Sequence, residues 1–235
     1  MEASSATIGI LLFPNLTQLD ATGPYEVFAR MPGATVALIA ATAAPIRSER
    51  GLTISPDATF ENAPALDVIC VPGGVGVNAA MEDEATLAFL RQRAGAARYI
   101  TSVCTGALLL GAAGLLRGYR ATTHWLSLDL LPLFGAEAVN ERVVTDRNRI
   151  TGGGVTAGID FGLAVAAALH GVAAAQEIQL MMEYDPAPPF PGGSPRSASP
   201  DLVRSVIRAR TKIQLERRTI AERAAVRLKN IVAEC

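Results

Sequence analysis

Cysteine, histidine and aromatic residues are scarce in this chain of 235 residues, and their scarcity excludes several classes of protein. The cysteines, Cys70, Cys104 and Cys235, form no CxxC pair and share no metal-ligand spacing with the histidines. We therefore expect no disulfide framework and no metal site. Free thiols are typical of proteins in the reducing cytoplasm.

Charge is also sparse, and it is nearly balanced. Charged residues make up 18% of the chain and the formal net charge is −1, so the protein as a whole does not attract nucleic acid or anionic lipid. The longest apolar stretch, 164–169, is far too short to span a bilayer. The first residues are polar and acidic, unlike a signal peptide. These features predict a cytoplasmic protein that binds neither nucleic acid nor membrane.

Apolar residues, in contrast, are abundant, and they make up 50% of the sequence. Short apolar runs alternate with longer helical patterns, and several runs are apolar throughout, as strands are when helices cover both faces of a parallel sheet. We predict strands at 7–13, 34–40, 67–71, 99–103, 139–145 and 149–151, with short strands and turns over 45–60. We predict helices at 23–30, 84–94, 105–113 and 159–169. This alternation predicts an α/β fold with a doubly wound, mostly parallel sheet.

The C-terminal part has a different pattern. Prolines recur through 185–200, so this stretch is predicted to be an extended connection. Residues 201–232 have helical apolar spacing, and arginines occupy the polar face: Arg204, Arg208, Arg210, Arg217, Arg218, Arg223 and Arg227. We interpret that face as solvated, because no second helix completes a helix-turn-helix unit that would bind DNA. We therefore divide the chain into a domain of residues 1–200 and a helical extension, 201–235, that packs on the domain or on a second subunit.

Cys104 stands where a predicted strand ends and a predicted helix begins. The same layout occurs in the G-x-S-x-G nucleophile elbow, where a tight turn exposes a side chain above the sheet. A thiol at a helix N-terminus also lies at the positive end of the helix dipole, which favours the thiolate. The alternative is a buried, inert cysteine, which describes Cys70 within its apolar strand. The local pattern at Cys104 leaves both interpretations open.

Asp20 and the Gly73-Gly74 turn also follow predicted strands, and doubly wound sheets bind ligands at that edge. The local sequence around Asp20 favours a helix N-cap, which accepts backbone N–H bonds. The glycines suit either a tight turn or the close approach of a ligand.

Two further features have structural interpretations as well. His124, beside Trp125, is interpreted as half of a packed pair. The turn that contains Gly153 is expected to shape a pocket, and it lacks the motif of a phosphate-binding loop.

Several segments together resemble the DJ-1/PfpI superfamily: SVCTGALLLGAAGLL, the VPGG turn at 71–74, and ATTHW. The resemblance extends over nearly the whole chain, to about residue 200. With LLFPNLTQLDATGPYEVF, ERVV, ITGGGVTAGIDF and MMEYDPAPPFPGGSP added, the ordered set is most similar to the isocyanide (isonitrile) hydratases. This resemblance implies a flavodoxin-like α/β sandwich of the class I glutamine amidotransferase-like type, without a cofactor. It also implies a homodimer with the cysteine near the interface.

The resemblance further implies roles for individual residues. Cys104 occupies the position of the nucleophile, and Asp20 that of the acidic residue that hydrogen-bonds the thiol. Thr105 follows the cysteine, as in the hydratases, whereas many protease-like relatives have histidine there. His124 matches a superfamily histidine whose part in hydration is left open.

The implied reaction adds water to an isocyanide. Cys104 attacks the terminal carbon while Asp20 delivers a proton, and water then releases an N-substituted formamide from the thioimidate. Asp20 needs a raised pKa to act as an acid near neutral pH. Backbone N–H groups of Gly74 and Thr105 are expected to stabilise developing charge, and Gly73 and Gly153 to border the substrate.

Two alternatives use the same fold. The first is a non-catalytic sensing domain related to AraC-type regulators, although too few residues follow Pro200 for their two helix-turn-helix units. The second is a DJ-1-like glyoxalase or redox-responsive protein, which usually carries glutamate where this chain has Asp20.

Overall fold

The central feature of the fold is a seven-stranded sheet in the order β10-β11-β7-β6-β1-β2-β5. The structure is a computed structural model that describes residues 5–233. The strands are β1 (Ala6–Leu11), β2 (Ala34–Ala40), β5 (Ala58–Thr59), β6 (Val68–Val71), β7 (Tyr99–Val103), β10 (Val143–Asp146) and β11 (Arg149–Gly152). All neighbours pair in parallel except β10 and β11. The mostly parallel α/β sheet predicted from the sequence is therefore confirmed.

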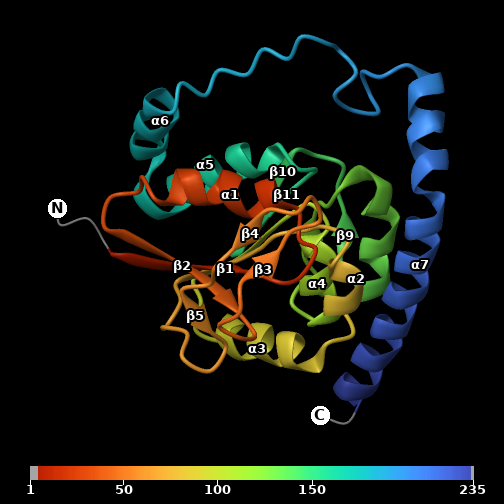
Figure 1. Cartoon of the computed structure of the whole chain (residues 1–235), viewed down its shortest axis with the longest axis horizontal. Coiled ribbons are helices and arrows are strands. Elements are labelled where there is room, and N and C mark those ends of the chain that lie inside the picture. The colour runs from red at the N-terminus through yellow and green to blue at the C-terminus, as the bar shows by residue number, and fades with distance from the viewer. Residues whose placement is uncertain (1–4, 234–235) are drawn as a thin grey trace.

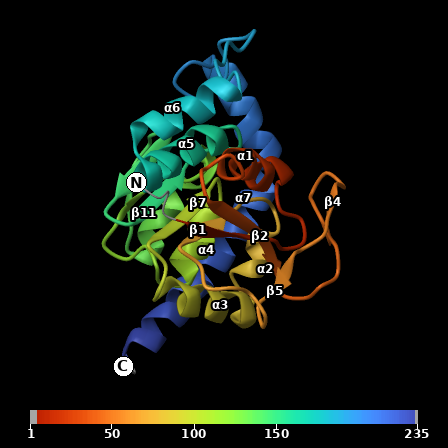
Figure 2. The same cartoon turned by 90° about the vertical axis from the view of Figure 1, so that its left-hand side faces the viewer.

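Helices cover both faces of this sheet (Figure 1). On one face lie α1 (Gln18–Phe28) and α5 (Ala157–His170), with α6 (Val172–Met181) packed on α5. The other face carries α2 (Val77–Ala80), α3 (Glu84–Ala94), α4 (Gly106–Ala112) and the 3₁₀ helix η1 (Trp125–Phe134). Two small sheets complete the chain: β3 (Ile46–Arg47) with β4 (Thr53–Ile54), and β8 (Arg120–Ala121) with β9 (Glu137–Ala138). The β3–β4 hairpin projects to one side of the molecule (Figure 2).

The structure differs from the predicted elements most clearly in three respects. The first helix begins at Gln18 instead of residue 23, so Asp20 lies in its first turn and Thr17 is the N-cap residue. The interpretation of Asp20 as an N-cap is therefore wrong. The strand predicted at 139–145 is shorter, because residues 139–142 pair with no neighbouring strand of the large sheet. Helix α6 and η1 were not predicted, since both are rich in apolar residues without a clear helical stripe.

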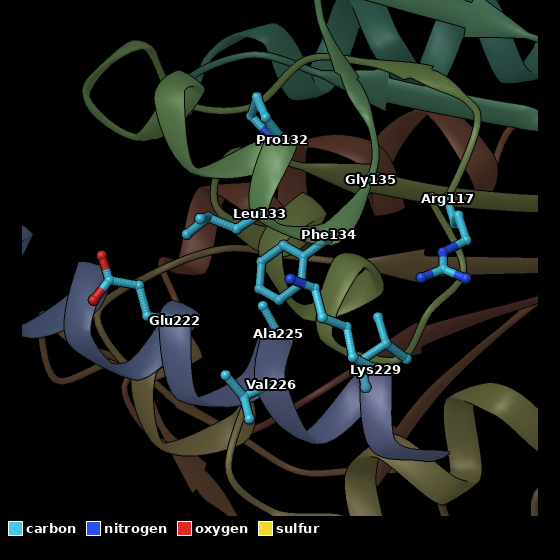
Figure 3. Close-up of a pocket in the computed structure, with 10 residues that line it drawn as sticks. Arg117, Pro132, Leu133, Phe134, Gly135, Glu222, Ala225, Val226 and Lys229 are labelled. Carbon is cyan, nitrogen blue, oxygen red and sulfur yellow. The ribbon is translucent and has the colours of Figure 1, made fainter. Parts of the chain in front are cut away.

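The C-terminal helix α7 (Pro200–Ala233) packs along η1, α4 and α2 (Figure 1). Buried Ile220, Ala221, Ala224 and Leu228 form its contact face. Near its C-terminal end, Phe134 of η1 points toward Ala225, beside a groove of about 420 Å³ (Figure 3). No helix within residues 5–233 is long and apolar enough to cross a membrane.

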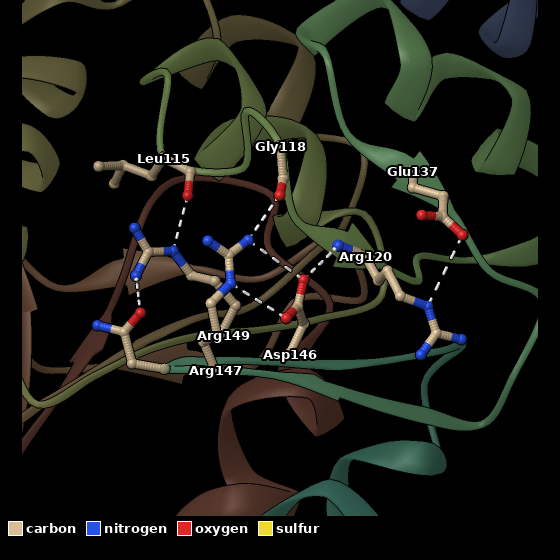
Figure 4. A network of polar contacts seen from close by, with 8 residues as sticks. Leu115, Gly118, Arg120, Glu137, Asp146, Arg147 and Arg149 are labelled. Atoms are coloured by element: carbon tan, nitrogen blue, oxygen red, sulfur yellow. Dashed lines mark hydrogen bonds and ion pairs between the residues drawn. The ribbon is translucent and has the colours of Figure 1, made fainter.

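A polar network fixes the β10–β11 hairpin at the sheet edge (Figure 4). Asp146 Oδ2 accepts the N–H of Arg120 at 2.8 Å, and Arg149 Nε donates to Leu115 O at 2.7 Å. Arg147 Nη2 donates to Gly118 O, so the hairpin is tied to the loop that follows α4. This hairpin leads into residues 152–154, which border the end of β7, and its position therefore influences the residues described next.

Candidate active site

Cys104 adopts an unusual backbone conformation between β7 and α4. Its φ angle is 56°, in the left-handed region that non-glycine residues rarely occupy. The turn is held from both sides: the Cys104 N–H donates to Gly152 O and Gly153 O at 3.0 and 2.9 Å, and Thr123 Oγ1 donates to Cys104 O at 2.7 Å. A strained residue kept in place by its surroundings is typical of functional sites. The turn therefore has the geometry of a nucleophile elbow.

Asp20 lies opposite Cys104 and is completely buried. Its Oδ2 accepts the N–H of Gly73 at 3.0 Å, and the carboxyl group interacts with the Cys104 thiol. Its Oδ1 has no hydrogen-bond partner in the described part of the chain. Burial raises the pKa of Asp20 to about 7, because the hydrogen bond from Gly73 only partly offsets the loss of solvation. Asp20 can therefore carry a proton near neutral pH.

The Gly73-Gly74 turn joins Asp20 to the elbow. Thr105 Oγ1 accepts the N–H of Gly74 at 3.0 Å and lies 3.2 Å from Gly74 O. A Cβ atom on Gly73 would lie 2.5 Å from Thr105 N and 2.9 Å from Asp20 Oδ2, so only glycine fits there. Gly74 has a φ of 130°, which side chains rarely permit. Both glycines are thus required by the close packing of the turn against the pair.

The Cys104 sulfur is surrounded by polar groups although the residue is buried. The nearby backbone N–H groups of Thr105 and Val155 lower the pKa of its thiol. Burial raises the pKa of the Cys104 thiol, and negative charge on Asp20 raises it further. The two groups cannot both ionise near neutral pH, so they titrate as a coupled pair that shares a proton.

The N–H donors expected to border a substrate are mostly engaged within the protein. The Gly73 N–H binds Asp20, that of Gly74 binds Thr105, and that of Gly153 donates to Arg142 O at 2.9 Å. The N–H groups that lower the pKa of the Cys104 thiol are those of Thr105 and Val155, and Val155 was not predicted from the sequence. The only feature of the sequence that could have indicated Val155 is the glycine-rich turn that precedes it, just before a helix.

His124 lies in the same cavity as Cys104. Its Nδ1 accepts the N–H of Leu126 at 3.3 Å, which caps η1, and its ring stacks against Trp125 at 6.0 Å between centroids. Burial and the positive charges of Arg217 and Arg210 lower the pKa of His124 to about 4. The imidazole is therefore neutral near pH 7 and occupies a structural position in the cavity wall.

The cavity beside Cys104 has a volume of about 130 Å³. One wall comes from α7, through Arg210, Ile213, Gln214 and Arg217. Arg217 is only 4% exposed, so its assignment to a solvated helix face is wrong. Its position in the apolar stripe, four residues after Ile213 and three before Ile220, was the signal that could have revealed it.

Cys70 does not belong to this site. Cys70 is buried in β6, as expected for a structural residue, and Cys235 lies outside the described residues. Within 5–233, no three histidine, cysteine, aspartate or glutamate residues are grouped so that they could hold a metal ion.

Comparisons with known proteins find similarity to the DJ-1/PfpI family and to an isonitrile hydratase. The profile of the DJ-1/PfpI family matches residues 6–168. The chain is 57% identical over 222 residues to the isonitrile hydratase of Pseudomonas putida, which covers 94% of this chain and 97% of that protein. It also resembles the crystal structure of a THiJ/PfpI family protein from Pseudomonas syringae, with a TM-score of 0.91 and 44% identity over 94% of this chain and 92% of that one.

A regulator shares part of this similarity. The chain is 33% identical over 187 residues to the HTH-type transcriptional regulator GbdR of Pseudomonas aeruginosa, which covers 76% of this chain but 51% of the regulator. The shared fold therefore occurs both in an enzyme and in a larger regulatory protein.

Proposed function

The chain belongs to the DJ-1/PfpI family, and from this membership and the cavity geometry we propose that it is an isocyanide hydratase, which converts an isocyanide and water into an N-substituted formamide. The observation that carries the proposal is the buried pair of Cys104 and Asp20. This pair supplies a nucleophile that lines the cavity and a buried proton donor beside it, and both are needed to add to an isocyanide carbon.

In the first step, Cys104 Sγ forms a bond to the terminal carbon of the isocyanide. The carbon gains negative charge, and the Asp20 carboxyl group donates its proton there, which gives a thioimidate. The pKa of about 7 makes Asp20 a donor matched to neutral pH. The N–H groups of Thr105 and Val155 stabilise the thiolate before attack.

In the second step, the Asp20 carboxylate accepts a proton from water as the water oxygen attacks the thioimidate carbon. The proton left on the added oxygen moves to the nitrogen as the C–S bond breaks, so that the N-substituted formamide leaves. Cys104 departs as the thiolate beside Asp20, which has regained its proton from water, and the starting form is restored. The same carboxyl group thus acts first as acid and then as base. Gly73, Gly74 and Thr105 hold it against the elbow during both steps.

The test is turnover of a simple alkyl or aryl isocyanide, followed through formamide formation by the purified wild type, Cys104→Ala and Asp20→Asn. We expect turnover in the wild type only, with circular dichroism unchanged in both variants. Turnover that survives Cys104→Ala would remove the nucleophile from the mechanism. A wild type that hydrates no isocyanide would contradict the proposal, and the glyoxalase alternative would then be tested with methylglyoxal as the substrate.

A sensing domain is the second candidate, because GbdR is related to this chain. Among the described residues, Pro200–Ala233 is one continuous helix that packs along η1 and α4, not a pair of helices joined by a turn. Its Arg217 also borders the cysteine cavity. A helix engaged in this way fits an enzyme better than a DNA-binding unit.

We also propose a cytoplasmic homodimer. Val172, Leu180 and Met181 on α6 and Phe190 beyond it are exposed apolar side chains, with 64, 83, 74 and 77% of their surface accessible. Apolar residues gathered on one helix and its adjoining segment are typical of a surface that a subunit covers. Light scattering after size-exclusion chromatography tests this, and a monomeric mass would contradict it.

A further inference from the structure

Arg217 is a buried cation without a carboxylate partner. Its guanidinium donates to Asn78 Oδ1 at 2.9 Å, Ser127 Oγ at 3.3 Å and Gly74 O at 3.2 Å, all of which are neutral acceptors. No carboxylate within residues 5–233 lies at ion-pair distance from it, whereas the next residue, Arg218, pairs with Asp129.

The burial of Arg217 has an energetic cost. Removing an unpaired cation from water costs several kcal/mol, and neutral hydrogen-bond acceptors offset only part of that. Asp20, Arg149 and Arg217 are the buried charged residues among those described. Arg149 stacks on Tyr119 at the sheet edge, while Arg217 lines the cavity that contains Cys104. The placement of Arg217 therefore calls for an anion at this cavity.

Other ionisable groups near the cavity lie closer to solvent. Glu49 is partly exposed and accepts Thr17 Oγ1 at 3.0 Å, and Arg210 and Glu216 are exposed. His124 is neutral because its pKa is lowered to about 4. The remaining groups are Cys104 and Asp20, which together share one proton and one negative charge when the thiol is ionised.

Building on the proposed hydratase function, we propose that Arg217 is a positioning residue whose guanidinium balances the single negative charge shared by Cys104 and Asp20. The proton leaves Sγ and is held on the Asp20 carboxyl group, so the pair keeps one proton and becomes a thiolate beside a carboxylic acid. With Arg217, this group of three has no net charge. Arg217 favours the form that carries the charge on Sγ, because its guanidinium lines the cavity together with Cys104, and its bond to Gly74 O holds the turn that positions Asp20.

The test measures the rate at which iodoacetamide alkylates Cys104 as a function of pH, with the modified peptide identified by mass spectrometry. The pH at which the alkylation rate is half-maximal is the midpoint of this profile, and it reports the pKa of the Cys104 thiol. A nearby opposite charge shifts a pKa by about 1 to 3 units, so Arg217→Met should raise this midpoint by that amount. The alkylation rate at pH 7 should then fall about tenfold or more. Arg217→Lys keeps the positive charge and should restore most of the wild-type profile.

Arg218→Met is the matched control, since it removes an arginine from the adjacent position, outside the cavity wall, and should leave the midpoint unchanged. If Arg217→Met does not fold, Arg217→Gln replaces it, because the amide keeps a donor for the neutral acceptors but carries no charge. A lower melting temperature with an unchanged midpoint would overturn the proposal and leave Arg217 a purely structural residue.

The alkylation profile is independent of isocyanide turnover. A shifted midpoint in a protein that hydrates no isocyanide would keep the role of Arg217 and remove the proposed function. Isocyanide turnover by the wild type together with an unshifted midpoint in Arg217→Met would keep the proposed function and remove the role of Arg217.

Discussion

Replacing Asp20 with asparagine should make the protein more stable at high pH. The pKa of Asp20 is about 7 in the folded protein and 3.8 when unperturbed, because burial disfavours the carboxylate. A group with a raised folded-state pKa contributes stability below the unfolded value and loses it as the pH rises through the folded value. At 1.36 kcal/mol per unit, ionisation of Asp20 therefore destabilises the wild type by about 4 kcal/mol above pH 7.

The asparagine oxygen still accepts the Gly73 N–H, and the side chain cannot ionise. The stability difference between Asp20→Asn and wild type should therefore increase with pH, by about 3 kcal/mol between pH 5 and pH 8. Urea unfolding at several pH values measures it, and exposed Asp185→Asn, which should show no such increase, is the control. A difference that stays constant from pH 5 to pH 8 would refute the raised pKa of Asp20.

Two more substitutions test the geometry around the pair. Gly73→Ala places a Cβ atom 2.9 Å from Asp20 Oδ2, so it should displace the carboxyl group and reduce isocyanide turnover at least about tenfold. Gly193→Ala is the control and should leave turnover unchanged, because a Cβ atom there meets open space. Equal turnover in the two variants would contradict the prediction. Thr123→Val removes the 2.7 Å hydrogen bond to Cys104 O and leaves a buried carbonyl unpaired, which should cost about 1–3 kcal/mol of unfolding free energy. Thermal unfolding of the valine and serine variants measures this, and a serine variant as unstable as the valine variant would argue against the hydrogen bond.

Much of the fold follows from local sequence. The strands β1, β2 and β6 are apolar nearly throughout, as is typical of strands in a parallel sheet that helices cover on both faces. The elbow at Cys104 follows from a strand, small residues and a helix in immediate succession. The order of the strands in the sheet could not be predicted, because the pairing of strands from distant segments is set by packing.

The site was only partly predictable, for a physical reason. Asp20, Gly73 and Cys104 each follow a strand, so the sheet edge gathers them. Arg217 comes from a helix far along the chain, and helical periodicity gives the face of a residue but not what that face contacts. The local sequence around Asp20 favoured a cap, since a carboxylate before a helix and one in its first turn look alike without the exact start of the helix.

The two halves of the proposed reaction make opposite demands on the same cavity. Burial raises the pKa of Asp20 and so prepares it as an acid, but the same burial raises the pKa of Cys104 and opposes formation of the thiolate. A more open cavity would favour the thiolate and lose the acid. The conflict is resolved when positive partial charges reach the sulfur without admitting water, and the N–H groups of Thr105 and Val155 do this directly. Under our proposal, Arg217 adds a full positive charge from α7, so the helix that forms one wall of the cavity also offsets the effect of burial on Cys104.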